Sequence, residues 1–310
     1  MAELAEVLDL MDLADVRSRE LLGEHERSEV AAVVERARAR YGFVGEVLVV
    51  AVAGGTGSGK SSIVNALVGH EVVNTGVVRP TTQEACAVYP EGCASDLGPM
   101  LDALGVRDRI PTAALDDVVL VDLPDFDSVE EAHRHVVDLV LPRVDAVVWV
   151  MDPEKYADPL VHDEFLTELV EHESQFVFVL NQLDRVEAAQ ADVVGSLRDH
   201  LRHDGFADPV VAGASASPRD GSDPDVSQLV EAIERHLDVK NTTLSKLAVD
   251  LRAAANAGWR ACRTAGNEAE QDDERWEAAL AAATFVTLGV AAYEIFARTT
   301  EAQTARSDTA

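Results

Sequence analysis

The chain has 310 residues, of which 56 are acidic and 26 are basic, and its formal net charge is −30. Its hydrophobic fraction of 47% and charged fraction of 26% are ordinary globular values, which exclude a disordered chain, a collagen and a disulfide scaffold. Because no basic patch offsets the negative charge, nucleic acid is an unfavourable partner. The three cysteines are never spaced as CxxC, which predicts free thiols and no zinc site.

Residues 1–43 are predicted to form an N-terminal helical segment. Apolar residues recur there at helical spacing with an interruption near Gly23, so we expect one or two amphipathic helices. The acidic start MAELAEVLDLMD lacks the basic region and the long apolar core of a secretory signal. We therefore expect no signal peptide and a cytoplasmic protein.

In residues 44–240 the hydrophobic pattern changes to short, valine-rich runs. Strands that are buried on both faces of a parallel sheet have this composition. The predicted strands are 47–52, one ending near Tyr89, 118–121, 146–151, 176–180 and 210–212. The predicted helices are 60–68, 129–141, 162–172, 188–203 and 226–237. This alternation predicts a three-layer α/β domain with a mostly parallel sheet. Residues 91–116, broken by several glycines and prolines, are expected to be an insertion or a short helix at its edge.

Residues 241–310 are predicted to form an Ala-rich C-terminal helical segment. We expect it to pack on the N-terminal segment, since neither can bury its apolar stripe alone. The uncharged run 278–293 is shorter than the ~20 residues that a membrane span needs. Two readings stay open: a buried bundle helix, or a membrane-associated segment over 278–297 with anchors at Trp276, Tyr293 and Arg298.

The strongest motif is GGTGSGKS at 54–61, which fits G-x-x-x-x-G-K-[ST] between a predicted strand and a predicted helix. Its glycines allow successive backbone N–H groups to surround phosphates, and the helix N-terminus adds positive potential. We predict that Lys60 contacts the β and γ phosphates and that Ser61 binds Mg²⁺. The predicted phosphate-side contacts are Gly54, Gly55, Thr56, Gly57, Ser58, Gly59, Lys60, Ser61 and Ser62.

A base-reading motif follows the predicted strand 176–180. Asn181-Gln182-Leu183-Asp184 is similar to N-K-x-D with glutamine in place of lysine. The Asp184 carboxylate can accept hydrogen bonds from the N1–H and 2-amino groups of guanine, whereas adenine would leave it unpaired. Gln182 keeps the methylenes that could cover the base but loses the charge. The predicted base-side contacts are Asn181, Gln182 and Asp184, together with Ser215 and Ala216 of a loop resembling S-A-x.

Two further segments supply predicted Mg²⁺ ligands. In Arg79-Pro80-Thr81-Thr82, one threonine would bind Mg²⁺ in the GTP state; we favour Thr82, with Thr81 left open. Asp122 follows the predicted strand 118–121, begins a sequence resembling D-x-x-G, and would hold Mg²⁺ through a water. The predicted metal ligands are thus Ser61, Thr82 and Asp122, and the predicted catalytic residues are Lys60, Thr82 and Asp122.

In this order, the motifs over residues 45–240 resemble the G domain of translation-factor-class P-loop GTPases, in the Era-like and dynamin-like branches. The segments DLPDFDS (122–128) and DPEKYAD (152–158) further resemble Era-like GTPases of actinobacteria, which often carry C-terminal helical or membrane segments. The resemblance implies a three-layer P-loop NTPase G domain with flanking helical segments, with Mg²⁺ and GTP or GDP as ligands.

Three departures from the family patterns concern hydrolysis. Asp125 replaces the glycine of D-x-x-G, Phe126 stands where Ras-like proteins keep a water-orienting glutamine, and Gly57 replaces the asparagine of potassium-activated relatives. No arginine can be named as a finger in cis. We therefore expect slow intrinsic hydrolysis, accelerated by a homodimer through the G domain or by an unidentified protein effector.

The sequence thus predicts a GTP-binding switch that hydrolyses GTP slowly to GDP and phosphate and is coupled to its flanking helices. One alternative is a bacterial dynamin-like GTPase that remodels membranes at the inner face of the cell membrane through residues 278–297. A second is a GTP-binding scaffold with negligible turnover, suggested by Asp125 and Phe126. An ATP-using enzyme is disfavoured by Asp184.

Overall fold

The structure is a computed structural model of the whole chain. It describes residues 4–18, 28, 47–75, 85–91, 93–124, 135–154, 156, 166–186, 190–268 and 272–307. The chain divides into two compact units, which are described separately below. The sheet unit comprises residues 46–236, and the helical unit comprises residues 1–45 and 237–310.

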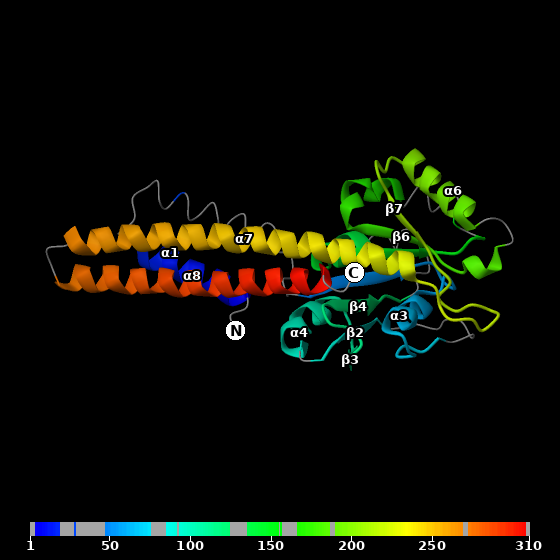
Figure 1. Cartoon of the computed structure of the whole chain (residues 1–310), viewed down its shortest axis with the longest axis horizontal. Helices are drawn as coiled ribbons and strands as arrows, with labels where there is room; N and C mark the ends of the chain where they lie inside the picture. The colour runs from blue at the N-terminus through cyan, green and yellow to red at the C-terminus, as the bar shows by residue number, and fades with distance from the viewer. Residues whose placement is uncertain are drawn as a thin grey trace. The chain divides into compact units, whose positions relative to one another are not determined.

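The sheet unit is built on a seven-stranded sheet in the order β3-β2-β4-β1-β5-β6-β7 (Figure 1). Its strands are β1 (Leu48–Gly54), β2 (Cys86–Pro90), β3 (Asp108–Thr112), β4 (Val118–Asp122), β5 (Ala146–Met151), β6 (Phe176–Leu180) and β7 (Val210–Gly213). Neighbouring strands are parallel except β2 and β4, which pair antiparallel. The mostly parallel sheet expected from the sequence is confirmed.

The central strands are buried along their whole length, which explains their valine-rich composition. Every residue of β1, β5 and β6 is buried. On β6, Phe176 and Phe178 stack with ring centroids 5.7 Å apart, and Phe206 meets Phe178 edge-on at 5.1 Å. Strands covered on both faces have no solvent side for polar residues, so their sequences read as continuous apolar runs.

The described helices of the sheet unit only partly match the expected ones. The α-helices are α3 (Lys60–Val68), α4 (Ala94–Ala103), α6 (Gln190–His203) and the first part of α7 (Ser227–Glu268). Predicted helices are confirmed by α3, α6 and α7, although α7 continues well beyond the predicted end at residue 237. The described parts of the predicted helices 129–141 and 162–172 are helical but not α-helical: η1 (His135–Val140) is a π-helix, and η4 (Leu166–Gln175) is a 3-10 helix. After η1, Pro142 lies in a short 3-10 turn, η2 (Leu141–Arg143). Proline has no N–H to continue the helical ladder, so the helix ends there.

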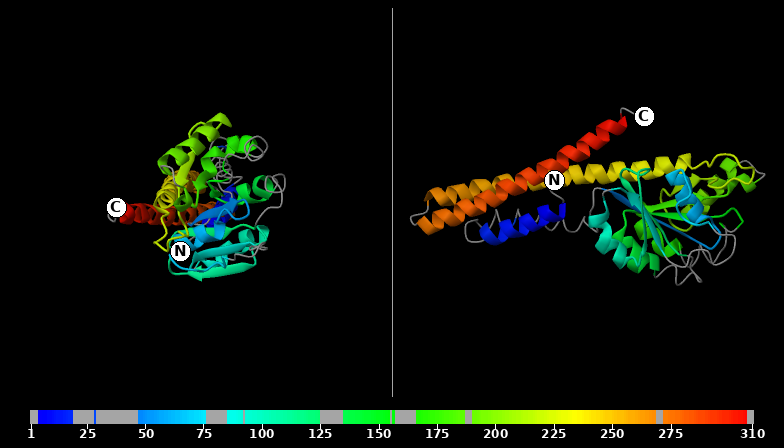
Figure 2. Two further views of the ribbon diagram at one scale, coloured as in Figure 1. Left: turned by 90° about the vertical axis from the view of Figure 1, so that its right-hand side faces the viewer. Right: turned by 90° about the horizontal axis from the view of Figure 1, so that it is seen from below.

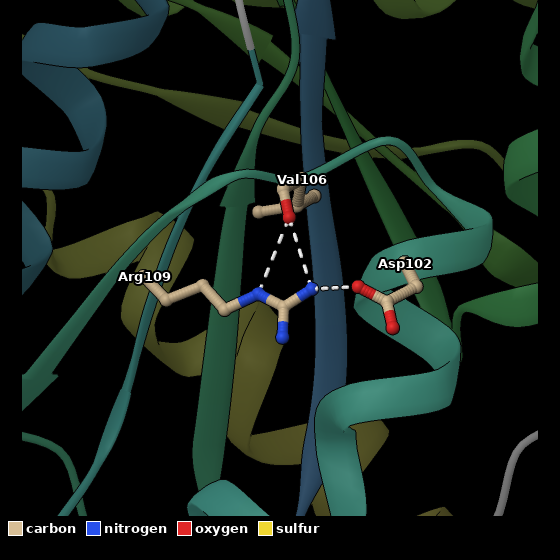
Figure 3. Close-up of polar contacts among 3 residues, drawn as sticks. All are labelled: Asp102, Val106 and Arg109. Atoms are coloured by element: carbon tan, nitrogen blue, oxygen red, sulfur yellow. Dashed lines mark hydrogen bonds and ion pairs between the residues drawn. The ribbon is translucent and has the colours of Figure 1, made fainter.

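The segment between β2 and β4 contains α4, as the sequence predicted, and also the unpredicted edge strand β3. Its sequence DRIPT includes Pro111 and has no apolar alternation, so no strand pattern was visible. An edge strand tolerates proline because the missing N–H costs no ladder hydrogen bond on its open side. Arg109 holds the turn before β3, donating from Nε and Nη2 to the Val106 carbonyl at 3.2 and 3.1 Å and pairing with Asp102 of α4 (Figure 3).

The described helices of the helical unit are α1 (Leu4–Ser18), the part of α7 (Ser227–Glu268) beyond residue 236, and α8 (Asp272–Ser307). The later part of α7 and the earlier part of α8 run side by side (Figures 1 and 2). Met11 and Ala14 of α1 belong to the same buried apolar cluster as residues of α7 and α8, and Arg17 donates to Thr284 Oγ1 at 2.9 Å. The expected packing of the two terminal segments on each other is confirmed.

Close packing between α7 and α8 depends on Gly258. A Cβ atom at this position would lie 2.3 to 2.6 Å from three ring carbons of Phe285, closer than any real contact allows. Phe285 is completely buried. The glycine therefore provides the space that the phenylalanine ring of the facing helix fills.

The uncharged run 278–293 lies entirely on α8, which has one buried and one exposed apolar face. Ala281, Phe285 and Leu288 are buried in the cluster, as the bundle-helix reading predicts. Leu280, Val286, Val290 and Tyr293 are about half exposed. None of the described helices combines the length and the apolarity that a membrane span requires.

The three cysteines differ in their surroundings, although none forms a disulfide. Cys86 and Cys262 are buried, whereas Cys93 is half-buried. Burial, reinforced by the negative charges of Asp122 and Asp108, raises the pKa of the Cys86 thiol to about 11, and burial raises the pKa of Cys262 to about 11.

We expect only Cys93 to react rapidly with a thiol reagent such as DTNB at pH 8. At a pKa of about 11, roughly a hundredfold fewer molecules carry the reactive thiolate than at the ordinary value of 9.0. Native protein should show one fast thiol, and urea-unfolded protein should show all three. The variant Cys93→Ser should lose the fast phase; a fast phase that survives this change would contradict the burial of the other two.

Candidate functional site

The loop at residues 54–61 joins the end of β1 to the start of α3, in the middle of the sheet. Two of its glycines are required by geometry. At Gly54, with φ 144°, a Cβ would lie 2.2 Å from the Val150 carbonyl oxygen. At Gly59, with φ 95°, it would lie 2.4 Å from the Asn181 side-chain nitrogen. The loop thus packs closely against β5 and the end of β6, and only glycine at these two positions permits it.

The loop's lysine is held inside it. Lys60 begins α3, is only 4% exposed, and donates from Nζ to the Gly54 carbonyl oxygen at 3.1 Å. An ammonium group this deeply buried is costly unless it is paired with acceptors or an anion. A phosphate group would supply such an anion at the N-terminus of α3.

The remaining phosphate-side residues are placed along the same loop and the first turn of α3. Gly55 and Gly57 are exposed, and Thr56 and Ser62 are half-buried. Ser58 is 2% exposed, and its hydroxyl has no hydrogen-bond partner among the residues that the structure describes.

Two of the three predicted Mg²⁺ ligands are brought together. Ser61 Oγ on α3 donates to Asp122 Oδ2 at the end of β4, at 2.7 Å. A hydroxyl and a carboxylate are hard oxygen donors, so these residues fit a Mg²⁺ ion that also binds phosphate oxygens. In the described ranges, no cluster of three or more His, Cys, Asp or Glu side chains could hold a metal ion. A Mg²⁺ ion shared with phosphates needs no such cluster. Thr81, Thr82, Asp125 and Phe126 lie outside the described residues.

Asn181 connects three predicted loops. It is almost completely buried, and its Nδ2 donates to the Ser58 carbonyl oxygen of the glycine-rich loop at 2.9 Å. Its Oδ1 accepts a hydrogen bond from the Ala216 backbone N–H at 3.1 Å. Gln182 makes a second link, from Nε2 to the Gly57 carbonyl oxygen at 2.9 Å, with its backbone in the left-handed region at φ 63°. Residues far apart in sequence thus form one site.

Asp184 lies just after the end of β6, near Asn181, and one of its two carboxylate oxygens accepts a hydrogen bond from the protein. Oδ2 accepts from the Arg219 backbone N–H at 3.2 Å, and the Asp184 N–H donates to Ser215 Oγ at 3.2 Å. Oδ1 is buried and has no hydrogen-bond partner in the described part of the chain. A buried carboxylate oxygen without a donor is unfavourable, so it favours binding of a ligand with N–H groups.

Sequence reasoning missed the residues that support the 213–216 loop. Gln228, in the first turn of α7, accepts from the Gly213 N–H at 2.9 Å, and Asp225 pairs with Ser215 through an isolated β-bridge. Neither residue belongs to a motif. Their role depends on α7 beginning beside β7, which no local pattern indicates.

Part of the chain is similar in sequence to known GTPases. Residues 49–182 match the family described as 50S ribosome-binding GTPase. A protein of Arabidopsis thaliana named "Probable transmembrane GTPase FZO-like, chloroplastic" is 27% identical over 161 residues, which cover 46% of this chain. The match spans only 16% of the length of that relative.

Solved structures to which the chain is similar include an oligomerised bacterial dynamin pair and Era bound to MgGDPNP and a segment of 16S ribosomal RNA. The dynamin is 15% identical, with 87% of this chain and 56% of that chain covered and a TM-score of 0.44. Era is 18% identical, with 62% of this chain and 57% of that chain covered and a TM-score of 0.42. The match to a GTPase family over residues 49–182 supports the Era-like or dynamin-like G domain that the sequence predicted.

Proposed function

We propose that this protein binds Mg²⁺ and GTP, hydrolyses GTP slowly to GDP and phosphate, and acts as a molecular switch coupled to its flanking helices. The observation that carries the guanine assignment is the placement of Asp184. Its buried Oδ1 lacks a protein donor in the described residues, and it lies beside Asn181, which is bonded to the glycine-rich loop. Guanine offers the two N–H groups that such a carboxylate accepts, and adenine does not.

The phosphate side supports the same proposal. Lys60 would bind the β and γ phosphates, and Ser61, Asp122 and Thr82 would hold Mg²⁺. When bound, Mg²⁺ neutralises charge that develops on the phosphates during hydrolysis. The slow rate rests on Phe126, whose side chain cannot hold the attacking water, and on Asp125, whose negative charge would repel the phosphate. An alternative with the same site is a GTP-binding scaffold with negligible turnover.

The substitution Asp184→Asn tests the guanine assignment. We expect the affinity for fluorescent GDP and GTP analogues to fall roughly tenfold to a hundredfold, because a charged acceptor of two hydrogen bonds is replaced by a group that accepts less and also donates. The same variant should gain affinity for xanthosine nucleotides, whose 2-oxo group accepts a hydrogen bond from an amide. Equilibrium titration in the presence of Mg²⁺ measures both changes.

Asp223→Asn is a matched control, since Asp223 is exposed and lies in the nearby surface loop. It should bind guanine nucleotides as the wild type does. Equal affinity of the wild type for ATP and GTP analogues would contradict the guanine assignment. Phosphate release measured at several protein concentrations tests activation by a homodimer, because turnover per molecule then rises with concentration.

The apolar face of α8 favours a second candidate, a dynamin-like GTPase that acts on membranes. Leu280, Val286, Val290 and Tyr293 are exposed on this helix, within the segment 278–297. Liposome co-sedimentation of the wild type, and of a variant with serine at these four positions, separates the candidates. The switch reading places the protein in the cytoplasm and the membrane reading at the inner face of the cell membrane.

A further inference from the structure

Gln228, in the first turn of α7, holds the end of the last strand of the sheet. β7 lies at one edge, so the described sheet offers no further strand to accept a hydrogen bond from the outward N–H of Gly213. Gln228 Oε1 accepts this hydrogen bond at 2.9 Å. Gly213 is buried, and a buried backbone N–H needs such an acceptor. One side chain of α7 therefore fixes the end of β7.

The end of β7 is in direct contact with the segment 181–184. A Cβ atom on Gly213 would lie 2.7 Å from Leu183 Cδ1 and 3.2 Å from Val194 Cγ2. The Leu183 N–H donates to the Ala214 carbonyl oxygen at 3.1 Å. Because the two segments are both packed and hydrogen-bonded, a displacement of Gly213 also displaces the segment that carries Asp184.

Asp184 itself is held by the loop that follows β7. Its N–H donates to Ser215 Oγ, and its Oδ2 accepts from the Arg219 N–H, both at 3.2 Å. Ser215 is in turn bonded to Asp225, which directly precedes α7: the Ser215 N–H donates to the Asp225 carbonyl oxygen at 2.8 Å, and its carbonyl oxygen accepts from the Asp225 N–H at 3.1 Å. The direction of the Asp184 carboxylate thus depends on how this loop is attached to the start of α7.

A cavity of about 430 Å³ adjoins these contacts. Its lining includes Leu183, Gly213, Ser215, Asp225 and Gln228. Groups that border a cavity have fewer van der Waals contacts than groups in a close-packed core. The hydrogen bonds from Gln228 and Asp225, rather than dense packing, therefore determine where the loop lies on this side.

We propose that Gln228 is a positioning residue for guanine discrimination. By holding Gly213 it fixes the loop that sets the direction of Asp184 and of its buried Oδ1. This role rests on the proposed function, in which that carboxylate accepts hydrogen bonds from the N1–H and the 2-amino group of guanine. Without the acceptor on Gln228 the end of β7 shifts, and the hydrogen bond to the 2-amino group weakens.

The test is Gln228→Met in the full chain, titrated with GDP and with inosine diphosphate (IDP) in the presence of Mg²⁺. IDP lacks only the 2-amino group, so the ratio of the Kd for IDP to the Kd for GDP measures the contact of this group with Asp184. We expect a wild-type ratio of about ten to a hundred, as for a hydrogen bond to a charged group. Methionine has a similar length but no oxygen acceptor, so the ratio should fall about fivefold, mainly through weaker GDP binding.

Two further variants separate this role from a general effect of substitution. Gln228→Glu keeps an oxygen acceptor, and a negative charge is favourable in the first turn of a helix, so its Kd ratio should stay within about twofold of wild type. Glu231→Ala is the matched control, because Glu231 is exposed on the same helix. It should leave both Kd values unchanged.

Hydrogen exchange of the Gly213 amide gives a readout without nucleotide. Exchange should be slow in wild type and in Gln228→Glu, and faster in Gln228→Met. Unchanged exchange in Gln228→Met would contradict the hydrogen bond on which the role depends.

An unchanged Kd ratio in Gln228→Met, with faster exchange at Gly213, would overturn the positioning role. Equal weakening of GDP and IDP would also overturn it, because Gln228 would then support the whole nucleotide site and not the contact at Asp184. A wild-type ratio near one would contradict the guanine contact of Asp184 in the proposed function, and this role with it. The wild-type titrations identify that case before any variant is compared.

Discussion

Replacing Lys60 by methionine (Lys60→Met) should weaken GTP and GDP binding by a hundredfold or more. Lys60 is 4% exposed and donates into the loop that would surround the phosphates. Methionine has similar length but no charge, so the phosphates lose a desolvated cation, an interaction that is strong where water is excluded. A hundredfold weaker affinity corresponds to about 2.7 kcal/mol.

Thermal unfolding with and without Mg-GDP measures this change in a second way. Ligand at a hundred times Kd stabilises the folded wild type by about 2.7 kcal/mol, and the variant should show almost none of this gain. Without nucleotide, the free energy of unfolding should change by only about 1 kcal/mol, since the lost hydrogen bond to Gly54 is offset by removal of a buried charge.

Lys246→Met is the control for a general effect of charge, because Lys246 is exposed on α7. It should leave nucleotide affinity and the stabilisation by Mg-GDP unchanged. If Lys60→Met bound GDP as tightly as this control does, the glycine-rich loop would not be the phosphate site.

The substitution Phe285→Ala should lower the free energy of unfolding of the helical unit by about 3 to 5 kcal/mol, the usual cost of removing a buried phenylalanine. The ring is fully buried in the cluster shared by α1, α7 and α8 and fills the space above Gly258. Urea unfolding followed by circular dichroism at 222 nm measures the loss. Val286→Ala, on the neighbouring position with 51% exposure, should change stability by less than about 0.5 kcal/mol.

Gly258→Ala gives an independent check on the same contact. In the wild-type background, the added methyl group overlaps the Phe285 ring, and this cost should exceed the gain of about 1 kcal/mol in helix propensity. In the Phe285→Ala background the space is open, so the same change should stabilise the protein. If the sign of the effect did not reverse between the two backgrounds, the packing of Gly258 against Phe285 would be wrong.

The sequence by itself determined the class of the sheet unit and the residue types of its site. Strands β1, β5 and β6 were predictable because their valine runs have no polar side, and α3 was predictable because it follows the glycine-rich motif. Lys60, Ser61, Asp122 and Asp184 could be named as candidate site residues for a similar reason. Phosphate, Mg²⁺ and guanine each restrict the residue types near them so strongly that short motifs carry the information.

Only the tertiary structure decided which distant residues meet. β3 has a polar sequence with a proline, and it is a strand only because β2 offers it a pairing edge. The links from Asn181 to Ser58 and Ala216, and from Asn65 to Val72 and Val73, are made by residue types that are common in turns and caps. The contact of Gly258 with Phe285 depends on the register of two helices. Such contacts form because loops and packing bring separate segments together in space. Local composition gives no information about either.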